Sequence, residues 1–202
     1  MISIINSLKT ILRGIAFLTI FLLSSCAVKS PLKPIDSSKG IHLSKLEHWQ
    51  LSARVAITTP EDSLTASLKW SKNNDLFDFL ISGAFGTTYA HLIQEKKLAI
   101  LKIPDSDPLT HENAEQLLQQ TLGWEFPLQA LSYWIKGIPS GHPNEQIIYG
   151  KEGKIDTIRL NNWLIEFSKH KRFQGYLMPK MIKVYHPDMS MKLVAKKWVF
   201  FE

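Results

Sequence analysis

Serine, histidine and acidic side chains are plentiful in this chain of 202 residues, but their spacing does not form the motifs that hydrolases use. Ser140 lies one place too late in Gly137–Gly141 for the strand-to-helix turn Gly-x-Ser-x-Gly. His111 and Glu112 begin like the zinc-binding helix of a metalloprotease, but the second histidine is missing. Neither a Walker phosphate loop nor Gly-x-Gly-x-x-Gly occurs. We therefore predict no enzyme, no metal and no cofactor, although distant residues could still meet in a catalytic triad.

Cys26, the only cysteine, is the one residue whose position predicts a covalent modification. Lys9 and Arg13 precede about ten mostly apolar residues, half the length that spans a membrane core of about 30 Å. This order of charge and apolar residues is typical of a secretory signal peptide. Leu23-Ser24-Ser25-Cys26 resembles the lipobox of bacterial lipoproteins, whose cysteine thiol receives diacylglycerol and whose new amino terminus is acylated after the leader is cut. The alternative is an ordinary signal peptide with a chance cysteine.

These signals divide the chain into three predicted parts: a signal peptide at 1–25, a lipidated tether at 26–42 and a globular domain at 43–202. The tether is rich in proline, serine and lysine, a composition typical of flexible linkers. Diacylglycerol and palmitate on Cys26 would bury methylene groups worth about 0.8 kcal/mol each, enough for near-permanent anchorage. Ala27 stands where an aspartate retains lipoproteins in the inner membrane of enterobacteria. The resemblance therefore implies the periplasmic face of the outer membrane.

The charge of the chain argues against one class of partner. The net charge is +6, and Lys9 and Arg13 of the predicted leader supply two of the 24 basic residues. A mature chain would therefore keep 22 basic against 18 acidic residues, which is too weakly basic to indicate nucleic acid. With 45% hydrophobic residues we expect a globular domain, and we expect it to be a monomer.

Period-two alternation dominates the predicted domain. Apolar residues fill every second position from Trp49 to Ile57 and again from Leu64 to Trp70, which predicts a hairpin with one apolar face. Similar but shorter patterns predict further strands over 76–82, 88–95, 97–103, 146–149, 154–161, 163–169, 181–186 and 189–200.

Two helices interrupt the strands. Thr110 is the predicted N-cap of the first, which carries apolar residues at helical spacing and ends at Gly123. The second follows Pro127 and stops at Gly137. About ten antiparallel strands with two amphipathic helices in mid-chain predict one large curved sheet or open barrel, with the helices lying against it.

The segment from Ser82 to Thr87 joins two predicted strands and places a large apolar side chain at its tip. Gly83 and Gly86 favour a tight, exposed loop, and Phe85 lies between them. Leaving a phenylalanine in water forgoes about 2 kcal/mol relative to its burial. Phe85 therefore either folds back onto the sheet or serves as a wedge that enters a bilayer or the cavity of a partner.

Several landmarks, weak singly but in the right order, make residues 45–200 resemble the LolB family of outer-membrane lipoprotein receptors. Ala53 replaces the glycine that the family commonly has before Arg54, and Phe85 stands where the family often has leucine. The wedge role therefore transfers by position and apolarity rather than by identity. The landmarks are Trp49–Arg54, Leu68–Trp70, Gly83–Gly86, Leu122–Gly123, Pro127–Leu131, Trp134–Pro139, Trp163 and Trp198.

The resemblance implies a mainly β fold with two or three helices: a half-open antiparallel β-barrel of the LolA/LolB kind, with a helical lid over an apolar cavity. It also implies a partner, a LolA-like periplasmic carrier, and a cargo, triacylated lipoproteins that are inserted among the phospholipids of the outer membrane. Gly83, Phe85 and Gly86 would form the membrane-insertion loop. The predicted acyl-chain cavity is lined by Leu51, Val55, Leu68, Trp70, Leu131, Trp134 and Ile135.

Two other classes of function stay open. The chain could be a lipidated scaffold of an envelope assembly complex, whose sheet is a partner surface and whose interior is solid. It could also be a lipid-modifying hydrolase, in which serine, histidine and aspartate would converge in a cleft.

Overall fold

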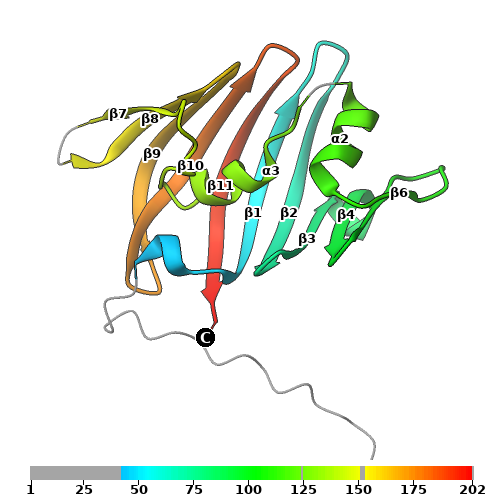
Figure 1. Cartoon of the computed structure of the whole chain (residues 1–202), viewed down its shortest axis with the longest axis horizontal. Helices are drawn as coiled ribbons and strands as arrows, with labels where there is room; N and C mark the ends of the chain where they lie inside the picture. The colour runs from blue at the N-terminus through cyan, green and yellow to red at the C-terminus, as the bar shows by residue number, and fades with distance from the viewer. Residues whose placement is uncertain (1–41, 124, 151–152, 202) are drawn as a thin grey trace, which may run out of the picture. The chain divides into compact units, whose positions relative to one another are not determined.

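The alternating segments form one antiparallel sheet in the computed structural model, which describes residues 42–123, 125–150 and 153–201 (Figure 1). Eleven strands of the described chain pair in the order β6-β5-β4-β3-β2-β1-β11-β10-β9-β8-β7. The strands are β1 (His48–Thr58), β2 (Ser63–Asn73), β3 (Leu76–Ser82), β4 (Thr88–Glu95), β5 (Leu98–Lys102), β6 (Leu109–His111), β7 (Gln146–Tyr149), β8 (Ile155–Leu160), β9 (Trp163–Phe173), β10 (Tyr176–His186) and β11 (Met189–Phe200).

At the centre of the sheet, the first and the last strand of the domain pair with each other. β1 pairs with its neighbour β2 on one side and with the last strand, β11, on the other, where Trp49 lies opposite Phe200. β6 and β7 form the two edges, so the sheet is open. This arrangement confirms the predicted mainly β fold with two helices and an open antiparallel sheet.

Some predicted strand limits are wrong. β9 and β10 extend to a tight hairpin at Gln174-Gly175, whereas the sequence predicted an end at residue 169 and a restart at 181. His170, Lys171 and Arg172 hide the alternation there, because polar residues occupy both faces near that end of the sheet. The short edge strand β6 is also absent from the prediction.

The two predicted helices are present as α2 (Ala114–Leu122) and α3 (Leu128–Trp134). The predicted N-cap, Thr110, is wrong, because Thr110 pairs with Ile100 in the β5–β6 ladder. Asn113 caps α2 instead, and its Oδ1 accepts hydrogen bonds from the amides of Glu115 and Gln116 at 2.9 and 3.1 Å. Gly123 ends α2 in the left-handed conformation, as predicted.

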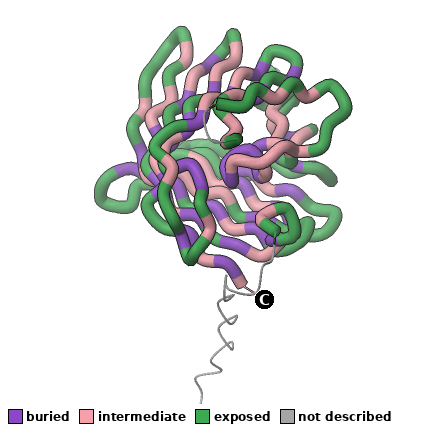
Figure 2. The backbone as a smooth tube through the Cα atoms, turned by 90° about the vertical axis from the view of Figure 1, so that its left-hand side faces the viewer, coloured by how far each residue is buried: buried purple, intermediate pink, exposed green. Residues whose placement is uncertain are grey.

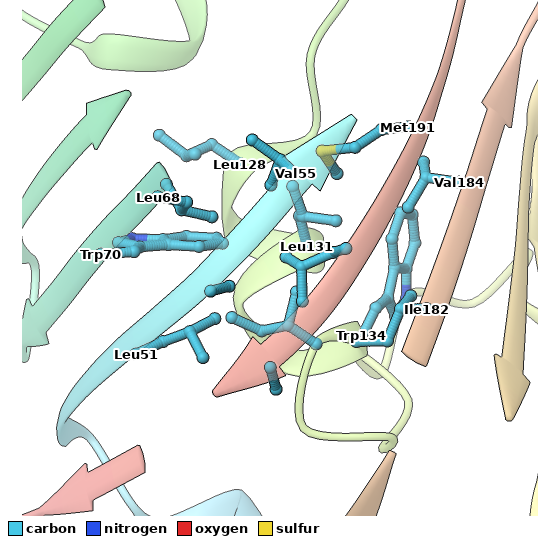
Figure 3. Packing of buried hydrophobic residues seen from close by; sticks show 14 of the residues in the cluster. Leu51, Val55, Leu68, Trp70, Leu128, Leu131, Trp134, Ile182, Val184 and Met191 are labelled. Atoms are coloured by element: carbon cyan, nitrogen blue, oxygen red, sulfur yellow. The ribbon is translucent and has the colours of Figure 1, made fainter. Parts of the chain in front are cut away.

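Both helices lie against the same face of the sheet. α2 contacts β4, β5 and β6, and α3 crosses the face of β1 and β11 (Figures 1 and 3). Figure 2 shows buried stretches along the strands and exposed turns around the rim. The alternate residues of β1 explain this pattern, since Leu51 and Val55 are buried beneath the helices while Gln50 and Arg54 face water.

Candidate functional site

The seven residues predicted to line a cavity all lie on the helix-covered face, in one apolar cluster. Leu51 and Val55 come from β1, and Leu68 and Trp70 from β2. α3 and the residue after it supply the rest, and each of the seven is at most 2% exposed. Figure 3 shows the side chains of α3 pointing toward those of the strands. The cluster also includes Leu128, Ile182, Val184 and Met191, which the sequence prediction left out.

An aromatic row crosses the sheet within this cluster. The Trp49 ring meets Trp70 edge to face at 5.2 Å and Trp198 at 5.3 Å, and Trp198 stacks on Phe200 at 5.5 Å. Trp70 continues the row to Phe79 on β3 at 5.1 Å. The indole N–H groups of Trp49, Trp70 and Trp198 are buried and have no hydrogen-bond partner within the described chain. The row is therefore held by ring contacts and burial rather than by a polar network.

A cavity of about 640 Å³ opens beside α3, where α2, the start of α3 and the β8–β9 turn meet. Its size lies within the range of about 300–1,000 Å³ that small-ligand sites occupy. Phe126 and Trp163, which both line it, pack edge to face with their ring centres 5.7 Å apart, and Ala130 and Leu160 add apolar surface. The other lining residues are mainly polar: Asn113, Glu115, Gln116, Gln119, Glu125, Pro127, Gln129, Tyr133, Ser140, Gly141, His142 and Asn161.

None of the seven predicted cavity residues lines this space. Sequence reasoning missed Phe126 and Leu160 because it took cavity candidates only from the apolar faces of strands and helices. A usable signal was the position of Phe126 directly before the proline that starts α3, since such residues often pack beside the helix entry.

Charged residues are buried at the opposite end of α3. Lys72 on β2 is 8% exposed and pairs with Glu47, and Lys136, just after α3, is 2% exposed. The Lys136 Nζ lies 4.9 Å from the centre of the Tyr133 ring, and the Tyr133 hydroxyl donates to Glu47 Oε1 at 3.4 Å. Two buried lysines and two half-buried side chains, Glu47 and Tyr133, thus meet in one site that three segments form.

The ionisable groups of this site shift one another's pKa values. Burial lowers the pKa of Lys136 to about 8, an effect that Glu47 opposes and Lys72 reinforces. Burial alone would raise the pKa of Glu47, but its hydrogen bond and charge contact with Lys72, helped by Lys136, hold it below the usual value. Burial raises the pKa of Tyr133, and Glu47 raises it further. The site thus favours an ionised Glu47 beside two amines.

Phe85 does not fold back onto the sheet. It is fully exposed, at 107% of its reference area, and stands at the tip of the turn η3 (Ala84–Gly86) between β3 and β4. Its φ of 65° lies in the left-handed region, which is uncommon for a bulky side chain. A Cβ at Gly83, at the base of the turn, would lie 2.7 Å from the Tyr89 hydroxyl oxygen, so a larger residue there would require the Tyr89 side chain to move. The loop therefore holds an aromatic side chain in water on a strained backbone.

Comparison with known proteins assigns the family. A family model described as outer membrane lipoprotein LolB matches residues 47–198. The chain belongs to the LolB family. The outer-membrane lipoprotein LolB of Pseudomonas syringae pv. syringae (strain B728a) is 28% identical over 196 residues, 96% of this chain and 94% of that protein. The LolB of Pseudomonas paraeruginosa (strain PA7) is 28% identical over 156 residues, 77% of this chain and 76% of that protein.

Among solved structures, a LolA superfamily protein from Nitrosomonas europaea is similar, with a TM-score of 0.46 at 9% identity over 78% of this chain and 88% of that chain. Membership of the LolB family confirms the predicted resemblance and makes the protein an outer-membrane lipoprotein that functions in lipoprotein localisation. The matched range includes both helices, the cavity and the Phe85 loop.

The predicted signal peptide, Cys26 and the tether up to residue 41 lie outside the described residues. No helix within the described residues has the length and apolarity to span a membrane.

Proposed function

We propose that the protein accepts triacylated lipoproteins from a LolA-like carrier, holds their acyl chains between α3 and the sheet, and releases them into the outer membrane. One observation carries the proposal: an apolar cluster on a single face of the sheet is covered by two short helices, and the first turn of one of them, α3, borders a cavity. A cover of this kind can be displaced at lower cost than a strand of the sheet. The protein works as a monomer in this account.

The energetics fit a passive acceptor. One acyl chain of sixteen carbons hides about 12 kcal/mol of methylene surface, so it cannot leave a carrier through water unaided. An apolar face on the acceptor makes the exchange nearly isoenergetic, so no nucleotide is needed. Contact between apolar surfaces has no preferred direction, which suits cargo proteins that share only their lipid.

Cys26 is the proposed attachment point of the protein's own lipid. In this account residues 1–25 are removed, residues 26–42 tether the domain at 43–202, and the periplasmic face of the outer membrane is the place of work. Acylation at Cys26 would then keep the acceptor within reach of the bilayer that receives its cargo.

The Phe85 loop, with Gly83 and Gly86 at its base, is the proposed contact with outer-membrane phospholipid. An exposed phenylalanine gains about 2 kcal/mol when it enters hydrocarbon, and the strained turn keeps it from collapsing onto the sheet. Phe85→Glu should fold normally and accept cargo, because the side chain makes no buried contact, but it should fail to insert that cargo into vesicles.

Two variants control this test. Phe85→Leu keeps an apolar tip and should retain insertion, and Tyr149→Glu adds the same charge at another exposed aromatic residue, on β7. The assay follows a labelled lipoprotein from the carrier into phospholipid vesicles. Full insertion by Phe85→Glu would refute the role of the loop.

A second candidate is a lipidated scaffold, and the dense packing of the seven cluster residues favours it. The two candidates differ in whether hydrocarbon enters this cluster. The acceptor should copurify with bound lipid or take up acyl chains, whereas a scaffold with a solid core should do neither.

A further inference from the structure

The segment Leu43–Glu47, which precedes β1, lies against the end of α3. The ammonium of Lys136 donates hydrogen bonds to the carbonyl oxygens of Leu43 at 3.3 Å and Leu46 at 3.2 Å. Leu46 is itself 2% exposed and belongs to the apolar cluster. We call Leu43–Glu47 the strap. In Figure 1 its η2 turn (Leu43–Lys45) is the blue element.

The strap also binds the sheet and α3 directly. The carboxylate of Glu47 pairs with the buried Lys72 of β2 and accepts a hydrogen bond from the Tyr133 hydroxyl of α3. The strap therefore makes polar contacts both to the sheet and to the helix that covers the sheet. These contacts are partly buried, and hydrogen bonds to a charged group are stronger than neutral ones.

α3 cannot set its own position. It has seven residues, fewer than the roughly 12–15 that an isolated helix needs to be even marginally stable in water. Its N-cap, Pro127, offers no side-chain acceptor, and its first turn faces the cavity. The end of the segment at Lys136 is the end that is fixed by buried polar contacts.

We infer that the strap is a positioning element that keeps α3 seated over the apolar cluster, with Lys136 as its central positioning residue. Release of Lys136 from the Leu43 and Leu46 carbonyls lets α3 rise from the sheet and exposes the face that would accept acyl chains. That consequence rests on the proposed function, but the seating of α3 by the strap does not.

The test uses the full-length lipoprotein in phospholipid nanodiscs and hydrogen–deuterium exchange read by mass spectrometry. Lys136→Met keeps a long, unbranched side chain but removes the donors. Exchange should accelerate about tenfold over residues 128–137 for each lost hydrogen bond to the ammonium, and should stay unchanged in β1 and β10. Lys102→Met, at an exposed lysine at the end of β5, is the matched control and should change neither region.

Glu47→Gln tests the other end of the strap. The same exchange measurement is made on this variant if Lys136→Met does not fold. Glu47→Gln keeps an acceptor for Tyr133 but removes the charge opposite Lys72 and Lys136, so exchange over 128–137 should again rise selectively. Unchanged exchange in α3, or an equal rise in every strand, would overturn the inference.

Cargo transfer, measured on the same samples, distinguishes failure of the strap hypothesis from failure of the proposed acceptor function. If both hold, Lys136→Met should accept a labelled lipoprotein faster while its capacity at saturation stays the same; damage to the acceptor face itself would lower the capacity. Faster exchange with no transfer in any variant would support the strap and refute the acceptor. Transfer at the wild-type rate together with unchanged exchange would refute the strap alone.

Discussion

The two helices on the inner face are held in opposite ways. α2 carries its own caps, with Asn113 at the start and Gly123 at the end. Gln94 of β4 fixes its first residue as well, because the Gln94 side-chain oxygen accepts from the Ala114 amide at 2.9 Å and its nitrogen donates to the Glu112 carbonyl at 3.4 Å. α2 is therefore a fixed cover over β4–β6.

α3 takes its end contacts from other elements. The amide of Gln129 donates to the carboxylate of Glu115, on α2, at 2.8 Å, and Lys136 reaches the strap at the other end. The acid lies at the helix N-terminus and the base beyond its C-terminus, as the helix dipole prefers. The position of α3 therefore depends on contacts between elements that can break, so α3 is the part of the cover that can open.

The largest effect expected from this comparison is the pH dependence of stability at the α3 end. The pKa of Lys136 is about 8 in the folded protein, below the ordinary lysine value of 10.5 that the unfolded chain has. Between these values the unfolded chain holds a proton that the folded protein has released, so the free energy of unfolding rises with pH across the window. The rise in the free energy of unfolding has an upper bound of about 3 kcal/mol, because each pKa unit corresponds to about 1.4 kcal/mol.

This contribution of Lys136 to the free energy of unfolding is measured by urea unfolding of the wild type and Lys136→Met at about pH 7 and about pH 10. Glu47, Lys72 and Tyr133 are common to both chains, so their own titrations largely cancel in the difference. The wild type should gain stability relative to the variant as the pH rises. A difference that stays constant with pH would show that the ammonium of Lys136 is not buried as described.

A smaller effect is expected at the α2 end. Asn113→Ala removes the acceptor for two amides and should lower the free energy of unfolding by about 1 kcal/mol, with exchange rising in α2 and not in α3. Asn113→Asp keeps the acceptor and is the control. An equal rise of hydrogen exchange in both helices would mean that they move as one cover, which would contradict the difference between α2 and α3.

The sheet, both helices and the family could be predicted because they depend on local patterns. Alternation in β1 and β2 and helical spacing around Leu117 and Leu131 are visible in one stretch of chain. The wedge candidate Phe85 was found from its glycines, but the sequence left its direction open until the exposed side chain was seen.

The strap could not be predicted. Lys72 and Lys136 read as surface residues, because lysine is almost never fully buried without a partner, and their partner Glu47 is distant in sequence from both. The cavity was missed for the same reason: Phe126 and Trp163 meet only after α3 and β9 have been placed by the sheet. Contacts between segments far apart in the chain leave no periodic signal.

The most direct test of the account is to find where the hydrocarbon goes. A lipoprotein with a photoactivatable acyl chain, delivered by its carrier, is cross-linked to the protein and the modified peptides are identified by mass spectrometry. The account predicts cross-links in α3 and at the inward residues of β1 and β2, among them Leu51, Val55 and Leu68. Cross-links confined to outward residues such as Gln50 and Arg54, while transfer proceeds, would contradict it.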